Sequence, residues 1–324
     1  MSTIRIDAAR ERLAGVVRRT PLAPFECADE RVELRLKLEC LQETGAFKAR
    51  GAWNQISQLT PAQRSAGVVT TSSGNHGKAL AWAAQRAGVR ATIVMPSDAY
   101  PNKVQACRDF GAEVVLAPTR GEAERICAER VGAGAVLVHP YDAERTIEGA
   151  GTVGLEIAEE WPELEVLAVQ VGGGGLLAGC ALAVRQSLGR KVWIVGVEPE
   201  GAASMKRSLE QGCAVTLDKI TTKVQGLCPP YSGTLNTEIC AREVDEVITL
   251  RDEEIFAAQR ELVVRGGWTV EPAGAAAAAL VLARRLPERL LAGRTRERRL
   301  RVACVVSGGN PDPAQLERIR AASS

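Results

Sequence analysis

The stretch "VQVGGGGLLAGCALAVRQ", Val169 to Gln186, decides the fold. An apolar run leads into four consecutive glycines, Gly172, Gly173, Gly174 and Gly175, and then into a helix-like pattern that begins near Leu176. Glycines let backbone N–H groups turn toward one anion, and a helix N-terminus adds positive partial charge. The spacing matches neither common nucleotide-binding glycine motif. We therefore predict a strand, a phosphate-binding loop and a helix, with a flexible or tightly packed turn as the alternative interpretation.

Short apolar runs alternate with helical patterns on both sides of this stretch. Runs of this kind bounded by Gly and Pro are typical of βαβ units with a parallel sheet. We predict an α/β protein, a two-lobed fold of twisted, mainly parallel sheets flanked by helices. Residues 61–145 are expected to form a small inserted domain, and residues 1–60 and 146–324 a large domain. A ligand is expected in the cleft between them, at the carboxyl ends of the strands.

Composition excludes several classes of protein. The 324 residues carry a net charge of only +2, which gives no basic surface for nucleic acid. No run is apolar enough for a membrane span, and no signal peptide is apparent. The nine cysteines include no C-x-x-C pair, so we expect reduced thiols and a cytoplasmic location.

Two further stretches carry polar residues at helix starts. In "TTSSGNHGKALAWAA", Thr70 to Ala84, we expect a helix start. The side chains of Ser72, Ser73 and Asn75 and the N–H groups of Gly74 and His76 are expected to converge there. Such a junction suits a carboxylate, although simple helix capping is the alternative. In "ETGAFKARGAWN", Glu43 to Asn54, a lone Lys48 opens a helix, and taken alone it would be a surface charge.

Five motifs together resemble a known family. "GAFKARGA", "TTSSGNHGKA", "VGGGGLLAG", "EPAG" and "VSGGN" stand in this order. Their order and distances resemble those of pyridoxal-phosphate enzymes of the tryptophan-synthase-β fold, also called fold type II. Within these, Ser73 and His76 favour the serine/threonine dehydratase and serine racemase branch.

The resemblance implies roles for individual residues in binding pyridoxal 5′-phosphate in the interdomain cleft. Lys48 is expected to form the Schiff base with the cofactor and to act as the general base once it is released. Ser73 is expected on the opposite face of the substrate as a second catalytic residue. The expected cofactor contacts are Phe47 on the ring face, Asn75 at the 3′-oxygen, Ser307 at the ring nitrogen, and Gly172, Gly173, Gly174, Gly175 and Leu176 at the phosphate. The expected substrate contacts are Ser72, Ser73, Asn75 and His76.

The function implied is that of a dehydratase, or ammonia-lyase. It would convert an L-β-hydroxy amino acid to a 2-oxo acid and ammonia by α-proton abstraction and β-elimination. An amino-acid racemase using Lys48 and Ser73 is the alternative, followed by a β-replacement synthase and by a cofactor-binding protein without turnover. The resemblance also implies a homodimer, and we expect no C-terminal regulatory domain.

The chain departs from the family pattern in two places. The family's divalent-cation site is matched by Glu198 and Ala202, but Ser204 stands where an acid is expected, so cation binding is uncertain. The segment from Val224 to Asn236 carries Val224-Gln225-Gly226 where dehydratases usually have an Ala-Asp-Gly sequence near the substrate. An insertion with Cys228, two prolines and Tyr231 follows it. This loop indicates either a pocket for a bulkier substrate or only a stiffened connection.

Overall fold

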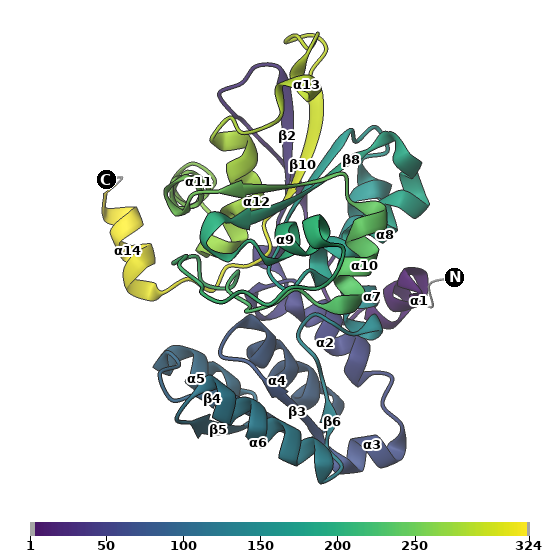
Figure 1. The fold of residues 1–324 in the computed structure, drawn as a ribbon, viewed down its shortest axis with the longest axis vertical. Helices are drawn as coiled ribbons and strands as arrows, with labels where there is room; N and C mark the ends of the chain where they lie inside the picture. The colour runs from purple at the N-terminus through teal and green to yellow at the C-terminus, as the bar shows by residue number, and fades with distance from the viewer. Residues whose placement is uncertain (1–3, 323–324) are drawn as a thin grey trace.

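The computed structural model describes residues 4–322 (Figure 1). Its larger sheet has six strands. Their order across the sheet is β1-β2-β10-β7-β8-β9. All neighbouring strands are parallel except β1 and β2, which form an antiparallel pair. The strands are β1 (Leu22–Phe25), β2 (Val32–Lys37), β7 (Val166–Gln170), β8 (Trp193–Pro199), β9 (Glu246–Leu250) and β10 (Leu300–Val305).

A second, parallel sheet of four strands forms the smaller lobe. Its order is β5-β4-β3-β6. The strands are β3 (Val68–Thr71), β4 (Ala91–Pro96), β5 (Glu113–Ala117) and β6 (Val136–Leu137). All four lie within residues 61–145, the range that the sequence predicts for an inserted domain. The predicted α/β class, with mainly parallel sheets flanked by helices, is confirmed.

The helices fill the intervals between the strands. Those of the first half are α1 (Ile6–Leu13), α2 (Lys48–Ile56), α3 (Pro61–Ala66), α4 (Asn75–Ala87), α5 (Pro101–Asp109), α6 (Arg120–Gly132) and α7 (Glu144–Glu160). Those of the second half are α8 (Gly175–Leu188), α9 (Ser204–Gln211), α10 (Thr234–Glu243), α11 (Asp252–Val264), α12 (Pro272–Leu282), α13 (Glu288–Leu291) and α14 (Pro313–Ala321). Among the described residues, none of these helices is both long and apolar enough to span a membrane.

Helices cover both faces of the larger sheet. On one face Val166 and Ala168 of β7 pack in a cluster with α11 and α12, and on the other Leu167 and Val169 pack with α7 and α8. Every residue of β7 is buried. A parallel strand that is buried on both sides reads as a continuous apolar run, which is why "VLAV" precedes the glycine loop. The apolar strand and helix hold this loop between two rigid elements.

Helix α2 lies between the two lobes (Figure 1). Its apolar residues Ala49, Ala52 and Ile56 belong to the hydrophobic core of the smaller sheet. Its polar residues instead contact α7 of the larger lobe, since Asn54 donates to Glu148 at 3.0 Å and Gln55 donates to Thr146 at 2.6 Å. Helix α2 precedes the range predicted for the small domain, yet one side of it packs in that domain's core.

Candidate active site

Lys48 is the first residue of α2, and its amine is buried within the protein. Nζ donates a hydrogen bond of 2.6 Å to the carbonyl oxygen of Pro140, and it lies 4.9 Å from the centre of the Phe47 ring. The residue as a whole is only half-buried, but burial of the amine lowers its pKa from 10.5 to about 8. The positive end of the α2 dipole also favours the neutral form. The lowered pKa therefore increases the fraction of the amine that is neutral near pH 7.

Ser307 lies beside the Lys48 helix start. It follows β10 and is 5% exposed, and its carbonyl oxygen accepts a hydrogen bond of 3.0 Å from the N–H of Phe47. An isolated bridge between Ala46 and Gly308 continues the same pairing. Within the described residues no hydrogen bond engages the Ser307 hydroxyl. The structure thus brings the predicted residues Phe47, Lys48 and Ser307 together.

The glycine loop joins β7 to α8. Gly174 adopts a left-handed conformation with φ of 97°, which favours glycine. None of the hydrogen bonds of the described residues uses the backbone N–H of Gly172, Gly173 or Gly174 as a donor, and the first N–H groups of α8 have no partner inside the helix. Leu176, the second residue of α8, is buried. The loop therefore presents a row of free amides, as a phosphate site requires.

The segment from His139 to Asp142 connects the lysine to the glycine loop. Pro140 accepts from Lys48, while the Tyr141 ring packs directly against Gly173, where a Cβ atom would overlap it. The amide of Asn236 donates to the carbonyl oxygens of Tyr141 and Gly173, at 3.1 and 2.8 Å. The main chain of Tyr141 is thus fixed between the predicted lysine and the predicted phosphate site.

The start of α4 carries the predicted substrate residues. Ser72 Oγ accepts from the N–H groups of Gly74 and Gly77 at 3.3 and 3.2 Å, so it caps the helix. His76 is buried, its Nε2 contacts the Val138 carbonyl at 2.9 Å, and burial lowers its pKa to about 3. Its imidazole therefore stays neutral, and its contact with the Val138 carbonyl oxygen gives it a structural role rather than that of a base. Ser73 is half-buried and makes no side-chain hydrogen bond within the described part of the chain.

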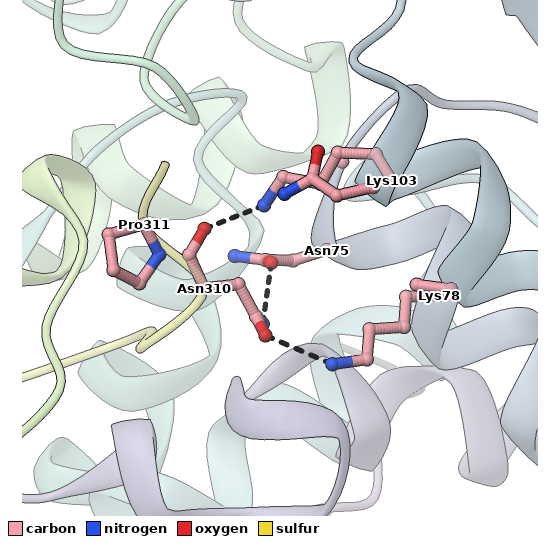
Figure 2. A pocket seen from close by; sticks show the side chains of 8 residues that line it. Asn75, Lys78, Lys103, Asn310 and Pro311 are labelled. Atoms are coloured by element: carbon pink, nitrogen blue, oxygen red, sulfur yellow. Dashed lines mark hydrogen bonds between the residues drawn. The ribbon is translucent and has the colours of Figure 1, made fainter. Parts of the chain in front are cut away.

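Asn75 belongs to a network that crosses between the lobes. Its amide donates to Glu271 at 2.5 Å and accepts from Asn310 at 2.9 Å. Lys78 and Lys103 donate to the side-chain and main-chain oxygens of Asn310, at 3.0 and 2.6 Å. Figure 2 shows Asn75, Lys78, Lys103 and Asn310, which line one cavity. The volume of this cavity is about 130 Å³. The network joins Asn75 of the small lobe to Asn310, which lies in the segment that follows β10 in the large lobe.

The side chain of Glu271 is part of this network, which the motif "EPAG" does not predict, because an acid at a helix start is commonly favoured there by the helix dipole. It does stand before α12, but its side chain makes no capping hydrogen bond. It is 7% exposed and bonds Asn75 instead. Burial raises its pKa, and the nearby Lys103 partly opposes this rise. The only sequence signal was its place in "EPAG", and that motif does not say which way the side chain points.

A buried network of ion pairs holds α2 through its residue Arg50. Arg50 pairs with Glu39 at 2.7 Å and with Glu156 at 2.6 Å, and Lys37 pairs with Glu156 at 2.7 Å. Burial alone would raise the pKa of Glu39, but the charge and hydrogen bonds of Arg50 and the hydroxyl of Thr20 hold it below its usual value. Arg50 stands two residues after Lys48, so this network anchors the turn that carries the lysine.

The residues predicted for a divalent cation do not fit one. Both oxygens of the buried Glu198 accept backbone N–H groups at the start of α9, from Met205 at 2.8 Å and from Lys206 at 2.9 Å. Burial raises the pKa of Glu198 to about 7. Ser204 Oγ, at the position where an acid is expected, is hydrogen-bonded to Ser232 Oγ at 2.9 Å. Ala202 could offer only its backbone carbonyl oxygen, which is the ligand that the family pattern assigns to this position. A hard cation prefers several free carboxylate or carbonyl oxygens, so the glutamate acts here as a helix cap.

Comparison with known proteins gives consistent matches. A family model described as "Pyridoxal-phosphate dependent enzyme" matches residues 13–308. The chain is 38% identical over 318 residues to an L-threonine ammonia-lyase of Thermotoga maritima, covering 97% of this chain and 77% of that protein. It is 38% identical over 321 residues to a phenylserine dehydratase of Ralstonia pickettii, covering 97% and 94%. The structure of maize serine racemase superposes with a TM-score of 0.88 at 34% identity, covering 98% and 96%.

Proposed function

Since this chain belongs to the family of pyridoxal-phosphate dependent enzymes, we propose that it is a dehydratase, or ammonia-lyase, of L-β-hydroxy amino acids. The observation that carries the proposal is Lys48, whose amine lies beside Phe47, pairs with no carboxylate of residues 4–322, and has a pKa of about 8. Relatives named as a threonine ammonia-lyase and a phenylserine dehydratase support the same reaction class.

The residues at the site fit the cofactor. The amides of Gly172, Gly173 and Gly174 have no protein acceptor in the described chain, and the Ser307 hydroxyl has no described partner. The glycine amides would hold the phosphate, and the Ser307 hydroxyl would face the ring nitrogen. Phe47 would pack against the ring, and Lys48 would bind the aldehyde. When bound, pyridoxal phosphate supplies an electron-withdrawing ring that stabilises negative charge at the substrate α-carbon.

The chain's own residues would then carry out binding and proton transfer. The start of α4 binds the substrate carboxylate through its free N–H groups and its positive dipole. The neutral amine of Lys48 takes the α-proton, for which a pKa near the working pH is suited. The β-hydroxyl leaves as water, and one water is taken up when ammonia is released. The net reaction therefore gives one 2-oxo acid and one ammonia from each substrate.

A turnover assay tests this proposal. Purified protein loaded with pyridoxal phosphate is supplied separately with L-serine, L-threonine and 3-phenylserine, and 2-oxo acid and ammonia are measured. We expect equal amounts of both products from at least one substrate and none with Lys48→Ala. If no substrate of this class yields oxo acid from the loaded protein, the proposed reaction is wrong.

Racemisation is the second candidate, and one observation favours it. Ser73 is half-buried at the start of α4, and no described side-chain hydrogen bond engages its hydroxyl. A free hydroxyl on the face opposite Lys48 would return a proton there and give the D-isomer. The same assay distinguishes the two, because a racemase accumulates D-serine from L-serine without oxo acid. If both products form, Ser73→Ala should remove the D-isomer and spare oxo-acid formation.

We also propose that the protein acts in the cytoplasm as a homodimer. The nine cysteines support a reducing compartment, since all of them are free thiols. The dimer follows from family resemblance alone. Light scattering during gel filtration would give about twice the mass of 34.5 kDa, and a monomer mass would refute the dimer.

A further inference from the structure

We propose that Tyr141 and Tyr231 form an aromatic recess beside the reacting lysine, and that this recess makes 3-aryl-serines the preferred substrates. The inference rests on the proposed dehydratase function and deepens it by naming the substrate class. It concerns the specificity of the site rather than its chemistry.

The tyrosines of this chain converge on one part of the molecule. The chain has only three. The ring of Tyr141 packs on Gly173, and its centroid lies 5.9 Å from that of Tyr231 at an interplanar angle of 64°. The hydroxyl of Tyr100 accepts a hydrogen bond of 2.8 Å from Gln225. All three therefore lie at the glycine loop or at the segment from Val224 to Gly233, which departs from the family pattern.

The position of Tyr141 places the aromatic pair next to the chemistry. It directly follows Pro140, whose carbonyl oxygen contacts the Lys48 amine at 2.6 Å. The His139 ring packs edge-on against Tyr141 on the other side, at 4.7 Å and 84°. A substituent on the β-carbon of a substrate held at Lys48 would extend toward these rings.

The pair is built as a surface for a ring rather than as part of the core. Tyr231 is 37% exposed, and Tyr141 is only partly buried. Pro229 approaches the position of a Cβ on Gly172 to 3.6 Å and so extends the apolar wall. Edge-to-face contacts with an aryl group would cover this surface, because the positive ring edge meets the negative ring face. The hydroxymethyl group of serine is too small to do so.

The recess is fixed before a substrate arrives. The N–H of Tyr141 donates to His139 at 3.3 Å, and its carbonyl oxygen accepts from Asn236 at 3.1 Å. Tyr231 forms an isolated bridge with Thr216, and Gly233 donates to Gly173 at 3.0 Å. A surface that is already ordered loses little conformational entropy on binding. Gly172 and Gly173 thus serve both the phosphate site and the recess.

The test compares substrates and variants on cofactor-loaded protein. The value of kcat/KM is measured for 3-phenylserine, L-threonine and L-serine in the wild type, Tyr231→Phe, Tyr231→Ala and Tyr100→Phe. We expect the wild type to prefer 3-phenylserine to L-threonine by about tenfold or more. Tyr231→Phe keeps the ring and should keep the preference. Tyr231→Ala should lower it by about three- to tenfold while sparing L-threonine. Tyr100→Phe loses the hydroxyl that bonds Gln225 in the same segment but keeps every ring, so it should keep the preference and shows whether loss of a contact to this segment is enough to change it.

A binding measurement separates the recess from the reaction. L-Phenylalanine and L-alanine have no β-hydroxyl and cannot lose water, so their inhibition or dissociation constants report binding alone. L-Phenylalanine should bind more tightly than L-alanine and L-leucine. In Tyr231→Ala the affinity for L-phenylalanine should fall, while the affinities for L-alanine and L-leucine should stay the same. A wild type that prefers L-threonine, or a preference that Tyr231→Ala leaves unchanged, overturns the inference. If no substrate is dehydrated, the proposed function fails, and the binding constants still decide the recess.

Discussion

The amine of Lys48 is held in a place that opposes its positive charge. Burial lowers its pKa to about 8, it is the first residue of α2, and its described hydrogen bond is to a carbonyl oxygen rather than to a carboxylate. A protein gains no stability from this arrangement, because a charged amine would be better solvated on the surface. A residue held at such a cost is a candidate for function.

Replacement of Lys48 by methionine should therefore abolish activity and stabilise the cofactor-free protein. The folded pKa is about 8 against 10.5 in the unfolded chain, so folding disfavours the charged form below about pH 8 and the penalty vanishes above pH 10.5. We expect Lys48→Met to raise the free energy of unfolding by about 1–2 kcal/mol at pH 7. This figure allows for the loss of the hydrogen bond to Pro140. Activity should fall by at least about 10²–10⁴-fold.

Urea denaturation at pH 7 and pH 10 measures the effect on stability. The gain from methionine should shrink at the higher pH, where the lysine is neutral in the folded state. A variant that is less stable than the wild type at both values would show that the lysine is an ordinary structural residue.

At the scale of single elements, α2 depends on a buried arginine. Arg50 is 1% exposed and neutralises both Glu39 and Glu156. We expect Arg50→Met to lower the free energy of unfolding by about 3–5 kcal/mol, because it leaves carboxylates buried without compensation. Arg125 pairs with Glu122 and Glu129 on the exposed side of α6, and Arg125→Met should cost less than about 1 kcal/mol. Equal losses in the two variants, measured by denaturation, would contradict this account of the network.

The glycine loop is constrained by what packs against it. A Cβ at position 173 would overlap the Tyr141 ring, whose main chain is fixed by Asn236 and His139. We expect Gly173→Ala to cost about 1–3 kcal/mol of stability and to weaken pyridoxal-phosphate binding about tenfold or more. Gly121 in α6 has no atom within 4 Å of its would-be Cβ, so Gly121→Ala should be neutral or stabilising by about 0.5–1 kcal/mol. Fluorescence titration with the cofactor gives the affinity. Full affinity in Gly173→Ala would remove the loop from the site.

Local patterns in the sequence predict the elements better than the side-chain partners. The alternation of apolar runs and helices predicts the strands β2 to β10. The signal is strongest in β7, where every residue is buried, because a parallel strand covered on both faces is apolar throughout. Strand β1 (Leu22–Phe25) has no such signal, since it is a short antiparallel edge strand that contains Pro24.

The same limit applies to the site. Lys48, the glycine loop and Ser307 follow from motifs, which are local. Two other contacts at the site join residues that lie far apart in the chain: Tyr141 packs on Gly173, and Asn75 donates to Glu271. Nothing near Tyr141 or Glu271 in the sequence marks these contacts, so only the folded structure could reveal them.

At the scale of the whole molecule, Asn310 joins the two lobes. Its side chain accepts from Lys78 and donates to Asn75 and to the Thr44 carbonyl oxygen. We expect Asn310→Ala to lower the free energy of unfolding by about 1–3 kcal/mol and to raise the substrate KM. Asn102 lines the same cavity, and no hydrogen bond of the described residues uses its side chain. Asn102→Ala should therefore change stability by less than about 0.5 kcal/mol. Equal denaturation midpoints for the two variants would mean that the network does not join the lobes.

The measurement that tests the central claim most directly is the chemical trapping of the cofactor. The loaded protein is reduced with borohydride, digested, and mapped by mass spectrometry. The account predicts that the mass of the reduced cofactor appears on the peptide that contains Lys48, and that Lys48→Ala retains none after denaturation. Attachment at Lys78 or Lys103, the lysines of the neighbouring cavity, or at no lysine would contradict the assignment of the site.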